Sequence, residues 1–114
     1  MQPTQHTSDD VLNEILKRLI SEFQPEAIYF FGSRARGDSG ADSDYDLMLV
    51  IPNSAVMAGE PRYRRMQRVQ KILWGIWTAV DVIILTREEF DRERQVICSL
   101  PSTVLREGKQ LYAA

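Results

Sequence analysis

Apolar residues recur at helical spacing in the first part of the chain. Between residues 8 and 23 they form a single stripe, with polar residues on the remaining positions, and Pro25 follows two residues later. This pattern predicts an amphipathic helix that ends before the proline. The stripe consists of Val11, Leu12, Ile15, Leu19 and Phe23.

Three short apolar runs have the length and composition of buried strands. They span residues 27–31, 45–51 and 80–85 and are rich in branched and aromatic side chains. Gly32 follows the first run and Pro52 follows the second, and both residue types are common where a strand turns. We therefore expect a sheet of at least three strands.

The remaining segments predict helices. Residues 62–77, 87–97 and 99–107 carry helical patterns, and Thr86 with Glu89 forms a capping box for the second of them. Helix and strand therefore alternate along the chain, which favours a sheet flanked by helices. The predicted fold class is α/β (α+β by some schemes).

Composition narrows the class of protein. The 114 residues suit one domain spanning 1–114, with residues 1–7 as a flexible polar tail. A net charge of −2 argues against a large basic surface for duplex nucleic acid. A single cysteine excludes an internal disulfide, and no segment resembles a signal peptide or a membrane span. We expect a cytoplasmic protein.

Three aspartates stand out against the predicted strands. Asp44 and Asp46 are two residues apart at the entry to the second strand, so they share one side. A polar loop end with acidic turn residues explains this pair equally well. Asp81 lies in the third, otherwise apolar strand, where an unpaired carboxylate is costly to bury. Its alternatives are a solvent-facing edge position or an arginine partner.

Topology brings these carboxylates together. A long connection containing a helix typically joins parallel neighbours, so the second and third strands should begin at the same end of the sheet. Asp44, Asp46 and Asp81 then converge and can form a cage for two divalent ions such as Mg²⁺.

A second candidate feature follows the first strand. Gly32 lets a phosphate approach the backbone, Ser33 offers a hydroxyl, and Arg36 can neutralise phosphate charge. A plain turn is the simpler explanation of Gly-Ser, and Arg36 could instead pair with Asp38 or Asp42. For this loop to face the carboxylates, the first strand must run antiparallel to the other two. We therefore predict a mixed sheet.

These residues carry a resemblance. Residues 32–37 (Gly-Ser-Arg-Ala-Arg-Gly) and 43–47 (Ser-Asp-Tyr-Asp-Leu) resemble the signature of the polymerase-beta-type nucleotidyltransferase superfamily. More narrowly, they resemble the minimal nucleotidyltransferases that pair with HEPN-domain toxins, and Asp81 and the ending at 105–112 also look similar. The resemblance implies a nucleotidyltransferase fold.

The resemblance also implies an activity. It implies Mg²⁺-dependent transfer of AMP from ATP to a tyrosine of a HEPN-domain toxin, so that the chain acts as an antitoxin. Transfer to a small molecule such as an aminoglycoside, and neutralisation by contact alone, remain the alternatives. The implied metal-binding and catalytic residues are Asp44, Asp46 and Asp81. The implied nucleotide-binding residues are Gly32, Ser33, Arg36 and Ser43.

Three other features have simpler interpretations. Cys98 is expected to be a small buried residue. Trp74 and Trp77 are expected in the core or on a partner surface. The chain is a possible homo- or hetero-oligomer. The basic run at 62–71 is typical of a solvated helix face, with contact to nucleotide phosphates or to an acidic partner as the alternative.

Overall fold

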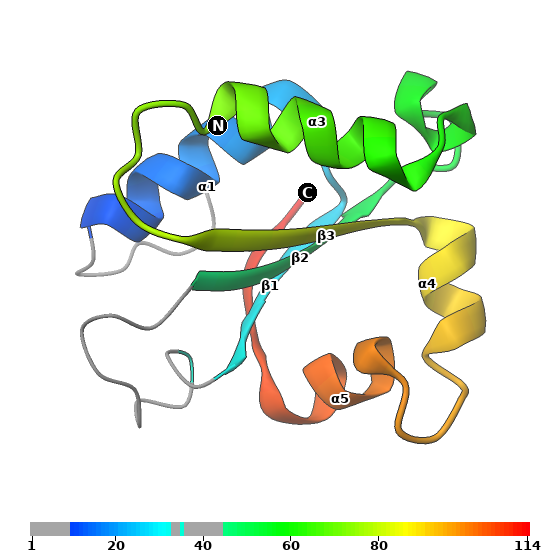
Figure 1. The fold of residues 1–114 in the computed structure, drawn as a ribbon. Helices are drawn as coiled ribbons and strands as arrows, with labels where there is room; N and C mark the ends of the chain where they lie inside the picture. The colour runs from blue at the N-terminus through cyan, green and yellow to red at the C-terminus, as the bar shows by residue number, and fades with distance from the viewer. Residues whose placement is uncertain (1–9, 33–34, 36–44) are drawn as a thin grey trace.

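The computed structural model of the chain describes residues 10–32, 35 and 45–114 (Figure 1). The prediction of a flexible tail at residues 1–7 lies outside these residues. In chain order the elements are α1 (Asp10–Phe23), β1 (Ala27–Phe31), β2 (Tyr45–Ile51), the 3₁₀ helix η1 (Val56–Gly59), α3 (Arg62–Ile72), β3 (Val80–Thr86), α4 (Arg87–Glu93), α5 (Leu100–Glu107) and β4 (Lys109–Ala113).

The described strands form one mixed sheet in the order β3-β2-β1-β4. β2 and β3 are parallel, whereas β1 runs antiparallel to β2 and to β4. The predicted fold class and the antiparallel first strand are therefore confirmed. β1 and β2 have the predicted bounds, and β3 extends one residue further, to Thr86.

β4 goes beyond the sequence prediction, which named no strand after residue 85. Residues 109–113 instead pair with β1, with a register shift between Ile28 and Tyr29. The strand begins with two exposed polar residues, Lys109 and Gln110, so residues 109–113 do not form an apolar run that would predict a strand.

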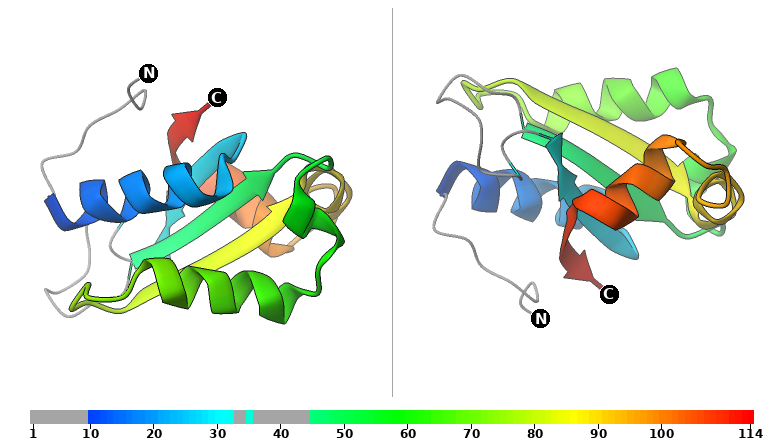
Figure 2. Two further views of the ribbon diagram at one scale, coloured as in Figure 1. Left: turned by 90° about the horizontal axis from the view of Figure 1, so that it is seen from above. Right: turned by 90° about the horizontal axis from the view of Figure 1, so that it is seen from below.

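Helices cover both faces of the sheet (Figure 2). α1 and α3 lie on one face, where Leu47 and Leu49 of β2 join the larger apolar cluster. α5 and the Phe90 side chain of α4 cover the other face, where Met48 and Val50 join the smaller cluster. The two-residue alternation along β2 thus divides its side chains between two cores.

α3 differs from its prediction in length and in orientation. It ends at Ile72 rather than Trp77. Gly75 in the following loop has a φ of +92°, whereas residues of a right-handed helix have negative φ values. The basic run at 62–71 was predicted to lie on a solvated face. In the structure Arg65 of this run is buried, whereas the apolar Tyr63 and Met66 are exposed.

Each of the last two helices begins within one residue of its predicted start. The capping box of Thr86 and Glu89 is formed, and the Ser99 hydroxyl caps α5 by accepting the Ser102 N–H at 3.2 Å. α4 ends at Glu93 rather than at residue 97. Cys98 is exposed with a φ of +67°, so the prediction that it is buried was wrong. Among the described residues, no helix combines the length and apolarity that a bilayer span needs.

Candidate active site

Asp46 and Asp81 lie side by side where β2 and β3 begin, an end of the sheet that we call the site end (Figure 1). Each is the second residue of its strand, and the two are register partners in the parallel pair. Neighbouring strands are about 4.8 Å apart, and register partners project from the same face. The two carboxylates therefore project together, with Asp81 exposed and Asp46 half-buried.

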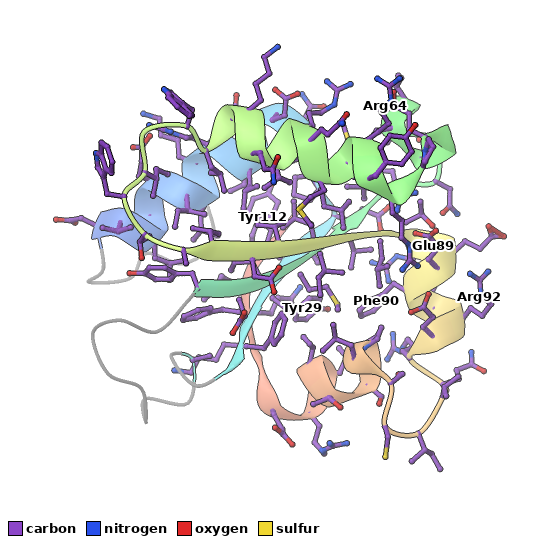
Figure 3. The ribbon with its side chains drawn as sticks, in the orientation of Figure 1. Tyr29, Arg64, Glu89, Phe90, Arg92 and Tyr112 are labelled. Atoms are coloured by element: carbon purple, nitrogen blue, oxygen red, sulfur yellow. The ribbon has the colours of Figure 1, made fainter. Side chains whose placement is uncertain are left out.

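Strand alternation identifies the face on which these carboxylates lie. Asp46 is two residues before Met48, which belongs to the core under α4 and α5. Asp81 is two residues before Ile83, which is partly buried and packs against that core. On that face the Tyr29 and Phe90 rings stack with centroids 5.8 Å apart (Figure 3). The carboxylates therefore continue, at the site end, the face that α5 covers further along.

Gly32 is pressed against the Asp46 carboxylate. In the antiparallel β1–β2 pair Phe31 is the register partner of Asp46, so the chain leaves β1 beside that residue. A Cβ atom at Gly32 would lie 2.2 Å from Asp46 Oδ2 and 3.1 Å from its Cγ, and the φ of Gly32 is +85°. Only glycine suits this position, because any side chain meets both the carboxylate and an unfavourable φ.

The other predicted site residues lie outside the described part of the chain. These residues are Ser33, Arg36, Ser43 and Asp44. Within the described part, no group of three or more histidine, cysteine, aspartate or glutamate side chains is arranged to hold a metal. The predicted cage has two of its carboxylates, Asp46 and Asp81, placed together, and its third member is Asp44.

The chemistry of the two placed carboxylates suits a divalent cation. Both offer hard oxygen ligands, which Mg²⁺ prefers. No ion pair joins Asp81 to a lysine or arginine in the described ranges, so an arginine partner does not account for its position in the strand. Asp81 instead occupies the solvent-facing edge position that was its other alternative, so it is not a buried carboxylate. A cation between the two side chains would offset the repulsion of like charges on neighbouring strands.

A backbone contact ties the α3–β3 loop to this site. The Tyr45 N–H donates to the Ala79 carbonyl at 3.0 Å, one residue before the β2–β3 ladder continues with Asp46 and Asp81. Sequence reasoning missed this contact because a backbone hydrogen bond between distant segments leaves no mark on residue type.

A partly buried ion pair between Arg65 and Glu89 fixes β3 from the opposite end, and Glu89 is labelled in Figure 3. Arg65, 3% exposed, donates to the Ile84 carbonyl at 3.0 Å and to Glu89 Oε1 at 2.9 Å. Burial alone would raise the pKa of Glu89, but hydrogen bonds from the Thr86 N–H and from Arg65 hold that pKa below its usual value. The pair joins α3, β3 and α4.

Comparison with known proteins identifies the family of this chain. A family model described as a nucleotidyltransferase domain matches residues 12–112. A candidate nucleotidyltransferase from Sulfolobus solfataricus is 34% identical in a structural match with a TM-score of 0.55, covering 73% of this chain and 70% of that one. No protein of curated function matches the sequence.

Two further solved structures share the fold. A chain of a toxin–antitoxin complex with AMP-PNP is 24% identical, with a TM-score of 0.57, covering 90% of this chain and 73% of that one. A chain of a tyrosine-to-alanine mutant of the MntA–HpeT toxin–antitoxin complex is 23% identical, with a TM-score of 0.58, covering 96% of this chain and 75% of that one. At these identities the likeness concerns the fold.

Proposed function

We propose that this chain, which belongs to the nucleotidyltransferase domain family, transfers AMP from ATP to a hydroxyl group of a partner protein. The observation that carries the proposal is the register of Asp46 with Asp81, with the Gly32 backbone against Asp46. It brings a turn suited to phosphate and a pair of carboxylates whose oxygens suit a divalent cation to one end of the sheet.

In this proposal the donor nucleotide lies on the β1 side of the site. Gly32 allows the triphosphate to approach the backbone, and Ser33, Arg36 and Ser43 hold phosphate oxygens. Asp44, Asp46 and Asp81 hold Mg²⁺, with two ions as the expected number. Bound Mg²⁺ supplies positive charge that offsets the charge of the phosphate oxygens.

The acceptor approaches from the β3 side. Asp81, which is exposed near the start of an edge strand, orients the acceptor hydroxyl and receives its proton. The hydroxyl oxygen then forms a bond to the α-phosphorus, and the bond between that phosphorus and the pyrophosphate oxygen breaks. Pyrophosphate leaves on the side of Gly32 and Ser33.

We further propose that the acceptor is a tyrosine of a HEPN-domain toxin and that the chain is its antitoxin. The resemblance in residues 32–37 and 43–47 supports this role, and so does the fold shared with chains of toxin–antitoxin complexes, one of them with AMP-PNP. Transfer to a small molecule and neutralisation by contact alone are the competing functions.

The decisive experiment incubates the chain with ATP, Mg²⁺ and the product of the neighbouring gene, which the proposal expects to be the toxin, followed by intact mass measurement. We expect an AMP-sized mass increase on the toxin, reduced at least about 100-fold in rate by Asp46→Asn and by Asp81→Asn, since each removes a carboxylate from the site. Glu88→Gln, which neutralises an exposed carboxylate at the other end of β3, should retain the wild-type rate.

Two results would contradict the proposal. One is an unmodified toxin in the wild-type reaction, and the other is full neutralisation of the toxin by Asp46→Asn, which would favour contact alone. Melting temperature serves as the control for folding. Without metal, Asp81→Asn should melt at or above the wild-type temperature, because the substitution removes repulsion between neighbouring carboxylates.

A further inference from the structure

We propose that the apolar surface around the free edge of β3 is where the acceptor protein docks, and that this protein brings an apolar segment flanked by a carboxylate. We call this surface the β3-edge surface and define it by Met66, Trp74, Trp77, Ile83 and Leu100. The proposal rests on the transfer to a protein acceptor proposed above.

The order of the strands assigns the two sides of the site to two substrates. Gly32 follows β1, which lies on one side of β2, and Asp81 belongs to β3 on the other side. Among the described strands β3 has no second neighbour. An acceptor that reaches Asp81 without crossing the nucleotide therefore approaches along the β3-edge surface.

Two apolar hollows meet on this surface. One, of about 380 Å³, lies between α3 and the α3–β3 loop and is lined by Met66, Trp74 and Trp77. The other, of about 370 Å³, runs along β3 and is lined by Met66, Ile83 and Leu100. Met66 lines both, so the two hollows adjoin at this side chain, and the loop at one end of them leads directly into β3 and Asp81.

The tryptophans are the least expected part of this surface. Trp74 is 86% exposed and Trp77 is 99% exposed, and they are the chain's only two tryptophans. Leaving two such large apolar side chains in water forgoes the free energy of burying them. Tryptophan is also enriched among the residues that dominate protein–protein binding. A partner that covers both would recover that burial.

The loop that carries them is anchored by its backbone. Arg18 of α1 donates to the Ile72 carbonyl at 3.2 Å and to the Trp74 carbonyl at 2.9 Å. At the other end of the loop the Ala79 carbonyl accepts the Tyr45 N–H. Because these contacts hold the backbone of the loop, a partner that binds has less backbone to order, which favours affinity.

Charge indicates what flanks the apolar segment of the partner. Lys71 is exposed one turn before Trp74, and within the described ranges it forms no ion pair. An acidic residue of the acceptor protein would complement it. This contact uses one residue of the basic run at 62–71, whereas Arg65 of the same run is committed to Glu89.

The test measures binding of the purified toxin to the chain by calorimetry, separately from AMP transfer. We expect the double substitution Trp74→Ala with Trp77→Ala to weaken binding at least about 100-fold, because each tryptophan acts as an anchor. Val56→Ala, which trims an 88%-exposed apolar side chain after the far end of β2, should change it less than about twofold.

Charge-reversal variants test the contact between Lys71 and an acidic residue of the acceptor protein. Lys71→Glu should weaken binding about tenfold and Lys109→Glu, on the opposite edge strand, should leave it within about twofold. Affinity for ATP with Mg²⁺ should stay at the wild-type value in all four variants, because none of them alters the carboxylates or Gly32.

The outcomes separate this proposal from the one it rests on. Toxin that binds through the tryptophans without receiving AMP would support docking and contradict the transfer. Transfer at the wild-type rate and affinity by the double tryptophan variant would overturn docking and leave the transfer standing. Docking is also overturned if wild-type chain fails to bind toxin, or if the substitutions only dissociate a second copy of the chain.

Discussion

At the scale of single residues, Gly32 and Asp46 depend on each other, because any side chain at Gly32 would meet the Asp46 carboxylate. Asp46 and Asp81 could be paired from the sequence, because the N-terminal ends of neighbouring parallel strands lie at the same edge of a sheet. Arg65 was mistaken for part of a solvated face, since its burial depends on Glu89, 24 positions away. Gly32 was predicted for phosphate alone, whereas it also leaves space for the Asp46 carboxylate.

The glycine gives a prediction with a matched control. Gly32→Ala and Gly75→Ala both place alanine at a positive φ, +85° and +92°, and each should lower the free energy of unfolding by about 1–2 kcal/mol. Only at Gly32 does the new Cβ meet Asp46, since nothing lies within 4 Å at Gly75. We therefore expect Gly32→Ala to slow AMP transfer about 100-fold at saturating toxin, and Gly75→Ala to leave the rate unchanged.

Chemical denaturation gives the stabilities, and intact mass gives the rates. Equal rates for the two variants would mean that the position of the Asp46 carboxylate does not matter for transfer.

At the scale of elements, the strands were predicted almost residue by residue because their apolar runs are local signals bounded by turn residues. Helix ends were less accurate. α3 stops at Ile72 because the chain turns through Gly75, and apolar residues beyond that point, such as Trp77, imitate a continuing helix. The capping box at Thr86 was predicted correctly, since both of its partners lie within four residues.

The contact between α3 and α4 predicts how stability depends on pH. The pKa of Glu89 is lowered in the folded chain, so its contribution is present above the ordinary glutamate pKa and is lost as the pH falls through the lower, folded value. At neutral pH, Glu89→Gln should lower the free energy of unfolding by about 1–3 kcal/mol, because Arg65 loses a charged partner but keeps its carbonyl acceptors.

Thermal melts across the acidic range should show the difference between wild type and Glu89→Gln shrinking as the pH drops. Glu107→Gln, which removes an exposed pair with Arg106, should cost less than about 0.5 kcal/mol at any pH. A constant difference for Glu89→Gln would mean that its charge does not stabilise the fold.

At the scale of the whole molecule, one sheet arranges the site and its surroundings. Its order places the turn after β1 and the free edge of β3 on opposite sides of β2. The sequence supplied the antiparallel direction of β1, because the loop had to reach the carboxylates. It did not supply β4, because pairing between β1 and residues 109–113 depends on contacts across the whole length of the chain.

The fourth strand should contribute strongly to stability. Leu111 is 3% exposed and belongs to the larger core, so Leu111→Ala should lower the free energy of unfolding by about 2–4 kcal/mol. Gln110→Ala, at the exposed neighbouring position, should change it by less than about 0.5 kcal/mol. Urea denaturation followed by circular dichroism measures both, and a small loss at Leu111 would mean that β4 is only loosely attached.

The exposed tryptophans have a practical consequence for spectroscopy. Indole emission shifts to the blue when water is excluded from the ring, and in this chain both indoles already face water in the folded state. Intrinsic fluorescence should therefore report unfolding poorly, with nearly the same emission maximum before and after the transition. For the same reason, a blue shift of the emission maximum would report an event that covers the α3–β3 loop and excludes water from these indoles.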